Sequence, residues 1–239
     1  MRVLQSILFS ITIAWAFNAV ALDANEEAAA NTPPATFLVY SVTWQPTFCK
    51  MQLERGKDAC KQIPQAFLPH GIWPYSESVG DRTNRHPQFC TTSPACNSGD
   101  ACEMGPEDVR TVLSNEPLRD LVTHDPAAMF AHEWKKHGTC SGKKIQAYFQ
   151  DFVDFRPAVK IKDKPAFEQM IGTETEFADI RKVFPTNTSF RCYRDAKGEQ
   201  YLHEVFYLID SEGQPYQKER NLQIGIRCAE EMTWIPRDA

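Results

Sequence analysis

The eight cysteines of the chain restrict the folds that it can adopt. An even number of cysteines in an exported chain favours disulfides over thiolate metal sites, and no C-x-x-C pair occurs here. The spacing alone leaves the pairing open, because eight cysteines allow on the order of a hundred pairings. The eight are Cys49, Cys60, Cys90, Cys96, Cys102, Cys140, Cys192 and Cys228.

Export is predicted by the N-terminal segment. Arg2 precedes an apolar run over residues 3–17, and residues 19–21 read Ala-Val-Ala. A positive start, an apolar stretch and small residues before a cleavage point are typical of a secretory signal peptide. The run is also near the length of a membrane anchor, but no cluster of charges follows it. We therefore expect residues 1–21 to be a signal peptide, cleaved after Ala21, and the mature protein to be secreted or periplasmic without membrane attachment.

The rest of the chain is predicted to form one domain. Residues 22–36 lack periodicity and are expected to be a flexible lead-in, and residues 37–239 are expected to be a single catalytic domain. With 42% hydrophobic and 11% aromatic residues, the chain can build a substantial core. Its net charge of −5 argues against a broad grip on duplex DNA, which basic proteins provide. Any contact with nucleic acid must therefore be a local site.

Strands are predicted near both ends of the chain, and helices between them. The expected strands cover residues 37–44, 66–73, 189–194, 200–210 and 222–228, the third and fourth of them forming a hairpin. Pro69 interrupts the second, which is therefore expected to carry a bulge or to lie at an edge. The polar residues 82–103 are expected to be a long loop. The expected helices cover residues 106–113, 126–137, 145–155, 165–171 and 174–183.

This order predicts an α+β fold, in which helices flank a mostly antiparallel central sheet. The helix over residues 126–137 has the clearest limits. Asp125 is a suitable N-cap, Pro126 suits the first helical position, and Gly138 suits the end.

The end of that helix carries the most informative segment, His132-Glu133-Trp134-Lys135-Lys136-His137-Gly138-Thr139-Cys140. At about 100° per residue, Lys136, Glu133 and His137 lie about 40°, 100° and 140° from His132. Two imidazoles, a carboxylate and an ammonium thus share less than half of the helix circumference. A solvated charged face would account for any one of them, but the four together predict the wall of an active site.

A zinc peptidase is the alternative to this hypothesis. Its H-E-x-x-H motif places two histidines four residues apart on one helix face, whereas His132 and His137 are five apart. The resulting rotation of about 140° is too large for them to share a metal ion, and Lys136 stands where the second ligand should be. We expect no catalytic metal.

A second motif, Phe67-Leu68-Pro69-His70-Gly71-Ile72-Trp73-Pro74, places a histidine in a proline-bounded turn before an aromatic residue. The ordered pair HGIWP and, about 60 residues later, HEWKKHGTC resembles the two signature segments of the ribonuclease T2 family. Residues 42–49 (VTWQPTFC) are similar to an early segment of the same family. The resemblance extends over about residues 37–228.

The resemblance implies an endoribonuclease that cleaves single-stranded RNA with little base specificity. The 2′-OH would attack the phosphate and leave a 2′,3′-cyclic phosphate, without metal or cofactor. By motif position, His137 would be the base and His70 the acid. The other positions imply that His132 holds phosphate, that Glu133 and Lys136 organise charge, and that Trp73 stacks on a base.

The family pattern also implies a disulfide pairing, Cys90–Cys140 and Cys192–Cys228, after which Cys49–Cys60 and Cys96–Cys102 follow as the remaining local pairs. The protein is expected to be a monomer by default. The remaining histidines, His86, His124 and His203, lie outside both motifs and are expected to be surface or structural residues.

Two functions of other classes stay open from the sequence. A hydrolase using Cys140 with a histidine would need a free thiol, which the even cysteine count disfavours. A binding or inhibitory module that keeps the family fold without activity is disfavoured by the intact set of charged and imidazole side chains. A count of free thiols tests the first alternative, and RNA cleavage by the purified protein tests the second.

Overall fold

The computed structural model of the protein describes residues 26–28, 35–57, 60, 63–79, 85–91, 102–121, 125–220 and 222–239. The predicted signal peptide lies outside these ranges, as do Cys96 and His124. In the described part of the chain, no helix combines the length and the apolar character that a membrane span needs.

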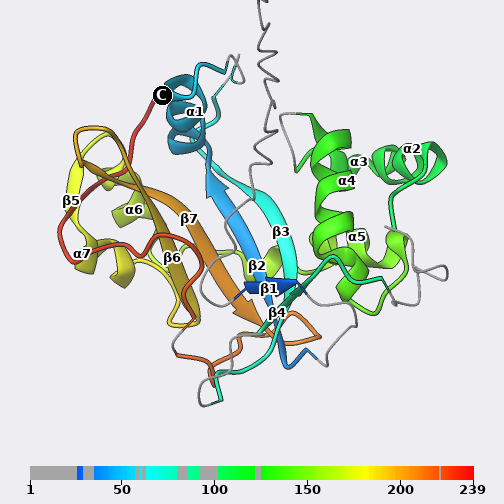
Figure 1. Cartoon of the computed structure of the whole chain (residues 1–239). Coiled ribbons are helices and arrows are strands. Elements are labelled where there is room, and N and C mark those ends of the chain that lie inside the picture. The colour runs from blue at the N-terminus through cyan, green and yellow to red at the C-terminus, as the bar shows by residue number, and fades with distance from the viewer. Residues whose placement is uncertain are drawn as a thin grey trace, which may run out of the picture.

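A mostly antiparallel sheet forms the centre of the molecule, as predicted (Figure 1). Its strands are β2 (Phe37–Trp44), β3 (Phe67–Tyr75), β5 (Glu174–Glu176), β6 (Thr188–Arg194), β7 (Gln200–Ile209) and β8 (Met232–Trp234). They lie in the order β3-β2-β7-β8-β5, and β6 also pairs with β7. The contact of β7 with β8 is parallel, and the other pairings of this sheet are antiparallel.

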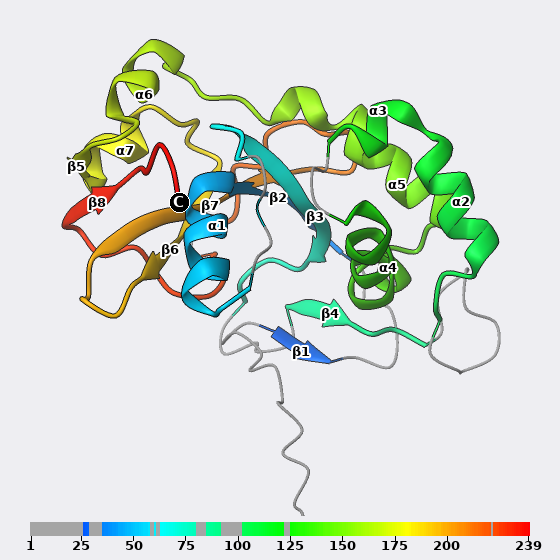
Figure 2. The same ribbon diagram turned by 90° about the horizontal axis from the view of Figure 1, so that it is seen from above.

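Helices flank this sheet and complete an α+β domain (Figure 2). They are α1 (Gln45–Glu54), α2 (Pro106–Ser114), α3 (Glu116–Arg119), α4 (Pro126–Lys136), α5 (Ile145–Asp154), α6 (Lys164–Met170) and α7 (Phe177–Lys182), with 3₁₀ turns at Gly138–Cys140 and Arg156–Ala158. Both views show α2 to α5, drawn in green, gathered beside the β3 end of the sheet. The Tyr148 hydroxyl of α5 donates to the Ile72 carbonyl of β3 at 3.0 Å and fastens this group to the sheet.

The central strands are buried on both faces. On β2, Tyr40, Val42 and Trp44 join the larger core, which the helices cover. Phe37 and Val39 point the other way and join a smaller core. Successive side chains of a strand alternate between the two faces of the sheet. One face therefore packs against the helices, and the other packs in the smaller core.

Some elements differ from the sequence expectations. Residues 222–228 are not a strand: Gly225 has a φ of +67° that breaks the extended chain, and only an isolated bridge joins Arg227 to Arg191. The first three residues of the helix expected over 174–183 form β5 instead, because they pair with β8. The helix α1, the short α3 and the strand β8 were not predicted.

The expected loop over residues 82–103 contains a strand, β4 (His86–Gln88). It pairs in parallel with β1 (Glu26–Ala28), which belongs to the lead-in that was expected to be irregular. Two three-residue strands leave too weak a pattern to be recognised in the sequence alone, because period-two alternation needs a longer run.

Three of the four implied disulfides lie within the described ranges: Cys49–Cys60, Cys90–Cys140 and Cys192–Cys228. The fourth pair includes Cys96, which lies outside them. The Cys90–Cys140 disulfide joins the end of β4 to the turn after α4, and the Phe89 amide donates to the Lys136 carbonyl at 2.9 Å beside it. These links hold β4 against the end of the helix that carries the predicted active-site wall.

Candidate active site

A β-bulge presents His70. The register of β2 against β3 pairs Ser41 with Gly71 and then Val42 with Pro69, so His70 is the extra residue. This confirms the bulge that Pro69 predicted, and β3 also lies at the edge of the sheet. Bulges disrupt the ladder locally and redirect a side chain, a device often found beside active sites. His70 keeps a side chain that is 37% exposed and therefore accessible.

His70 lies between two carboxylates. Its Nδ1 is 2.6 Å from Oε1 of Glu204, and its Nε2 is 3.6 Å from Oε1 of Glu133. Burial lowers the pKa of His70, but the charge and hydrogen bond of Glu204, supported by the charge of Glu133, outweigh it and raise the pKa overall. This histidine is therefore held toward its protonated form.

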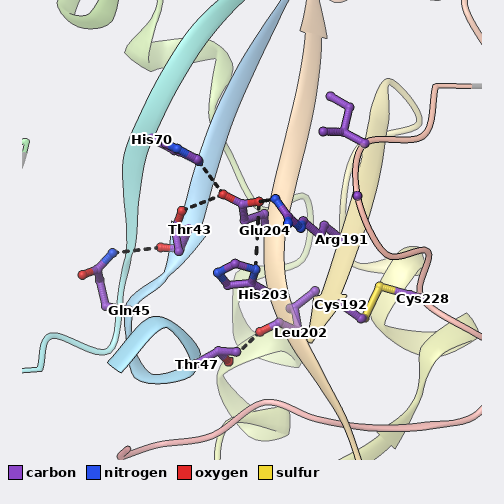
Figure 3. A network of polar contacts seen from close by, with 12 residues as sticks. Thr43, Gln45, Thr47, His70, Arg191, Cys192, Leu202, His203, Glu204 and Cys228 are labelled. Atoms are coloured by element: carbon purple, nitrogen blue, oxygen red, sulfur yellow. Dashed lines mark hydrogen bonds and ion pairs between the residues drawn. A yellow bond between two sulfur atoms is a disulfide. The ribbon is translucent and has the colours of Figure 1, made fainter. Parts of the chain in front are cut away.

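Glu204 was not predicted as a site residue. It lies on β7 opposite Thr43 of β2 (Figure 3). Its side chain is 1% exposed. The Thr43 hydroxyl donates to its Oε1 at 3.1 Å, and Nη1 of Arg191 donates to its Oε2 at 3.2 Å. Burial alone would raise the pKa of Glu204, yet His70, His203 and Arg191 lower it strongly. A charged residue within the apolar run of the predicted strand was the only signal available.

Glu133 is fixed by the aromatic residue of the first motif. Trp73 Nε1 donates to Oε2 of Glu133 at 2.9 Å, and the Glu133 side chain is 1% exposed. A Cβ at Gly71 would collide with both Glu133 and Trp73, so glycine is required at this position. Burial raises the pKa of Glu133, although His70 and the Trp73 hydrogen bond oppose this.

The position of Trp73 differs from the role implied for it. Its side chain is only 3% exposed and packs in the smaller core, with its ring against those of His137 and Phe206. An indole in this place presents no open face on which an RNA base could stack. Its contacts instead make it a support for Glu133.

His137 lies just past the last residue of α4 and is 1% exposed. Its Nδ1 is 2.9 Å from Nε2 of His86 on β4, and its Nε2 is 4.0 Å from Oε2 of Glu133. Burial, followed by the charges of His86 and Lys136, lowers the pKa of His137 well below its usual value. His137 is thus held neutral. His86, expected to be a surface or structural residue, is buried in direct contact with it.

The other two members of the wall are more open. His132 is exposed and Lys136 is half-buried, both on α4. Partial burial, the charge of Lys136 and the charge of His70 lower the pKa of His132. Of the four groups, His132 and Lys136 are thus the more accessible, and Glu133 and His137 are buried. The charges of Lys136 and His70 act on both His132 and Glu133.

A pocket of about 490 Å³ opens beside His70. Polar groups of β2, β6 and β7 meet apolar side chains of β3 and α4 along its wall, among them Thr43, Leu68, Met129, Arg191, His203 and Glu204. Within the described ranges, no three His, Cys, Asp or Glu side chains gather in a group that could hold a metal ion. The arrangement can hold one imidazole protonated and another neutral on two sides of a buried carboxylate.

Residues 35–221 match the model of the Ribonuclease T2 family, which is most of the chain. The chain belongs to the Ribonuclease T2 family. Both motifs, HGIWP and HEWKKHGTC, lie within the matched region. Membership of this family supports endoribonuclease activity.

Curated relatives and solved structures agree with this membership. The chain is 24% identical to "Intracellular ribonuclease LX" of Solanum lycopersicum over 182 residues, 73% of each chain. It is 23% identical to "Ribonuclease 1" of Arabidopsis thaliana, covering 78% of this chain and 80% of the relative. Ribonuclease MC1 from bitter gourd seeds shares the fold, with a TM-score of 0.60 at 20% identity, covering 83% of this chain and 99% of that one. The T2 fold therefore extends over nearly all of the described domain.

Proposed function

We propose that this T2-family protein cleaves single-stranded RNA by attack of the 2′-OH on the adjacent phosphate, without a metal or cofactor. The observation that carries the proposal is that the pKa values of two imidazoles beside the Glu133 carboxylate are shifted in opposite directions. The pKa of His70 is raised and that of His137 is lowered. Titratable groups whose environments push their pKa values apart are suited to serve as acid and base.

In this mechanism, neutral His137 takes the proton of the 2′-OH, and protonated His70 donates a proton to the departing 5′-oxygen. The phosphorus–oxygen bond to the 2′-oxygen forms as the bond to the 5′-oxygen breaks, which leaves a 2′,3′-cyclic phosphate. Each positioned proton transfer contributes typically 10²–10⁴ in rate. The nucleophile belongs to the RNA, so the reaction does not require a metal-bound water.

The charged groups of α4 support the crowded phosphate. His132 and Lys136 are the more accessible of the four, and we propose that they contact its oxygens. Fixed positive charge placed where negative charge develops in the transition state is often the largest single contribution to catalysis. Glu133 lies between the two imidazoles and balances the charge that they carry in turn.

The base role requires that RNA reach His137, whose side chain is almost fully covered. The cover includes His86 of β4, which contacts His137 directly. We propose that β4 shifts when RNA binds and that the exchange of this contact for the 2′-OH exposes Nδ1 of His137. Before RNA binds, the contact between His86 and His137 keeps the His137 ring oriented.

We further propose that the mature protein is secreted or periplasmic and acts as a monomer with little base specificity. The signal-peptide pattern of residues 1–21 and the three described disulfides support export. A curated relative, 19% identical over 186 residues, is named "Extracellular ribonuclease LE" of Solanum lycopersicum. The net charge of −5 supports a local RNA site rather than a duplex-binding face.

The test is product analysis after incubation with single-stranded RNA in excess EDTA. We expect fragments that end in 2′,3′-cyclic phosphate, at a rate within about twofold of that without chelator, because no catalytic metal is withdrawn. Loss of cleavage that added zinc or magnesium restores would contradict the proposal. Absence of any cleavage would favour the inactive binding module.

A further inference from the structure

We infer that Glu204 is a positioning residue for His70: it fixes the imidazole through Nδ1 and thereby presents Nε2 as the proton donor of the cleavage reaction. This inference rests on the proposed function. It adds a carboxylate from β7, outside both sequence motifs, to a site that the motifs confine to β3 and α4.

The geometry of the contact supports this role. The distance of 2.6 Å between Nδ1 of His70 and Oε1 of Glu204 is that of a strong, charge-assisted hydrogen bond. A carboxylate accepts only, so Nδ1 must carry the hydrogen in this contact. The neutral form of His70 then has its lone pair on Nε2, and the protonated form has its second hydrogen there. Nε2 is therefore the atom that exchanges a proton with RNA.

Glu204 is itself held in place from three sides. Thr43 of β2 donates to the same oxygen that contacts His70, and Arg191 of β6 binds the other oxygen. Nδ1 of His203 lies 4.0 Å from that second oxygen. A carboxylate that is 1% exposed and bound in this way has little freedom to rotate away from His70 (Figure 3).

The surroundings also show why Glu204 acts on His70 as an anion. Its own pKa is strongly lowered, whereas burial raises the pKa of Glu133, the other carboxylate beside His70. Burial lowers the pKa of His203 to about 4, so His203 is neutral at pH values above this. Of the two carboxylates beside His70, Glu204 is thus the one held in its charged form.

Several other charged groups near His70 also affect its pKa. Arg191 opposes its protonation from β6, and His132 and His137 of the α4 wall add repulsion when charged. Arg55 and Asp125 line the same pocket. Among these groups only Glu204 contacts Nδ1 directly, so removal of its charge has a predictable sign.

The test compares Glu204→Gln, which keeps the shape and removes the charge, with the wild-type full-length protein. NMR titration follows the His70 ring, whose resonance is assigned by its loss in His70→Ala. We expect the pKa of His70 to fall by about one unit or more in Glu204→Gln, because an opposite charge at this distance shifts a pKa by about 1–3 units. Glu204→Asp should restore part of the shift.

Kinetics provide a second readout. Loss of the protonated acid sets the alkaline limb of the pH profile of kcat, so this limb should move to lower pH in Glu204→Gln. We expect kcat to fall at least ~10-fold with KM within about threefold, since the acid is mispositioned while RNA binding remains. Asp151→Asn, which removes another buried carboxylate that bonds to Lys143, is the matched control and should change neither limb nor the His70 titration.

Glu204→Asp keeps the inference testable if Glu204→Gln fails to fold. Its carboxylate keeps the charge on a side chain that is one methylene shorter, so kcat and the pKa of His70 should both fall, because the shorter side chain holds Nδ1 less closely. A folded Glu204→Gln variant with an unchanged His70 titration and an unchanged pH profile would overturn the inference, as would a Glu204→Asp variant with the kcat and the His70 titration of the wild type. If the wild type cleaves no RNA, the proposed function fails, while the titrations still decide whether Glu204 controls His70.

Discussion

The packing around Glu133 leaves no space for a side chain at Gly71. A Cβ at this position would collide with the Glu133 carboxylate and the Trp73 indole. We expect Gly71→Ala to displace Glu133, to destabilise the fold by about 1–3 kcal/mol through overpacking and to lower kcat at least ~10-fold. Urea unfolding and RNA cleavage measure both effects.

Gly105 provides the control for this substitution. A Cβ there would come no closer than 3.4 Å to Asp108, which is ordinary contact. Gly105→Ala should therefore cost far less stability and leave kcat near that of the wild type. Equal effects of the two alanines would contradict the close packing of Glu133 against Gly71.

The identity of the base is the second question at the scale of residues. His137→Ala should lower kcat at least ~10², because it removes a proton transfer. His132→Ala should act mainly on KM, and Lys136→Ala on kcat. Steady-state kinetics on a short RNA separate these effects. If His132→Ala lost kcat while His137→Ala kept it, the exposed histidine would be the base and the proposed movement of β4 would be unnecessary.

The sequence predicted the site residues of the two motifs but not the residues behind them. His70, Glu133 and His137 are candidates by motif order, and the structure places both imidazoles within 4.0 Å of the Glu133 carboxylate. Glu204 and His86 could not be identified, because they reach the site through the register of β2 with β7 and through the position of β4. Such pairings join residues far apart in the chain, and local patterns do not encode them.

At the scale of elements, the Cys90–Cys140 disulfide positions β4 against the end of α4. We expect the double variant Cys90→Ala/Cys140→Ala to lose about 2–5 kcal/mol of stability and also kcat, because β4, which orients the His137 ring before RNA binds, is no longer tied to the end of α4. Cys49→Ala/Cys60→Ala is the control, since its disulfide spans 11 residues instead of 50 and lies on α1. Urea unfolding and cleavage rates of both variants measure the difference. An equal loss of activity in both would contradict a specific role for β4.

Long elements were predicted well, and short ones were not. The helices α4 and α5 and the hairpin of β6 and β7 follow from periodicity over many residues. The error at residues 222–228 has a clear cause: apolar residues stand at alternate positions of this segment, as in a strand, but Gly225 turns the chain and leaves Ile226 52% exposed. The apolar pattern therefore indicated a partly buried segment without indicating a strand.

At the scale of the whole molecule, an acidic protein must bind a polyanion through a confined site. The net charge is −5, yet α4 places His132 near both Lys136 and His70, and neither His132 nor Lys136 is buried. The α+β class could be predicted from the order of strands and helices, whereas the sheet order could not, because it depends on pairings between distant strands. That order is what brings β7, and with it Glu204, to His70, the proposed acid.

The most direct test of the central claim, internal attack by the 2′-OH, uses a short RNA with one 2′-deoxy nucleotide. The linkage on the 3′ side of that nucleotide lacks its nucleophile, so it should resist cleavage while the neighbouring linkages are cut at normal rates. DNA of the same sequence should remain intact. Cleavage at the deoxy position at the rate of the all-ribose control would refute internal attack and with it the proposed ribonuclease mechanism.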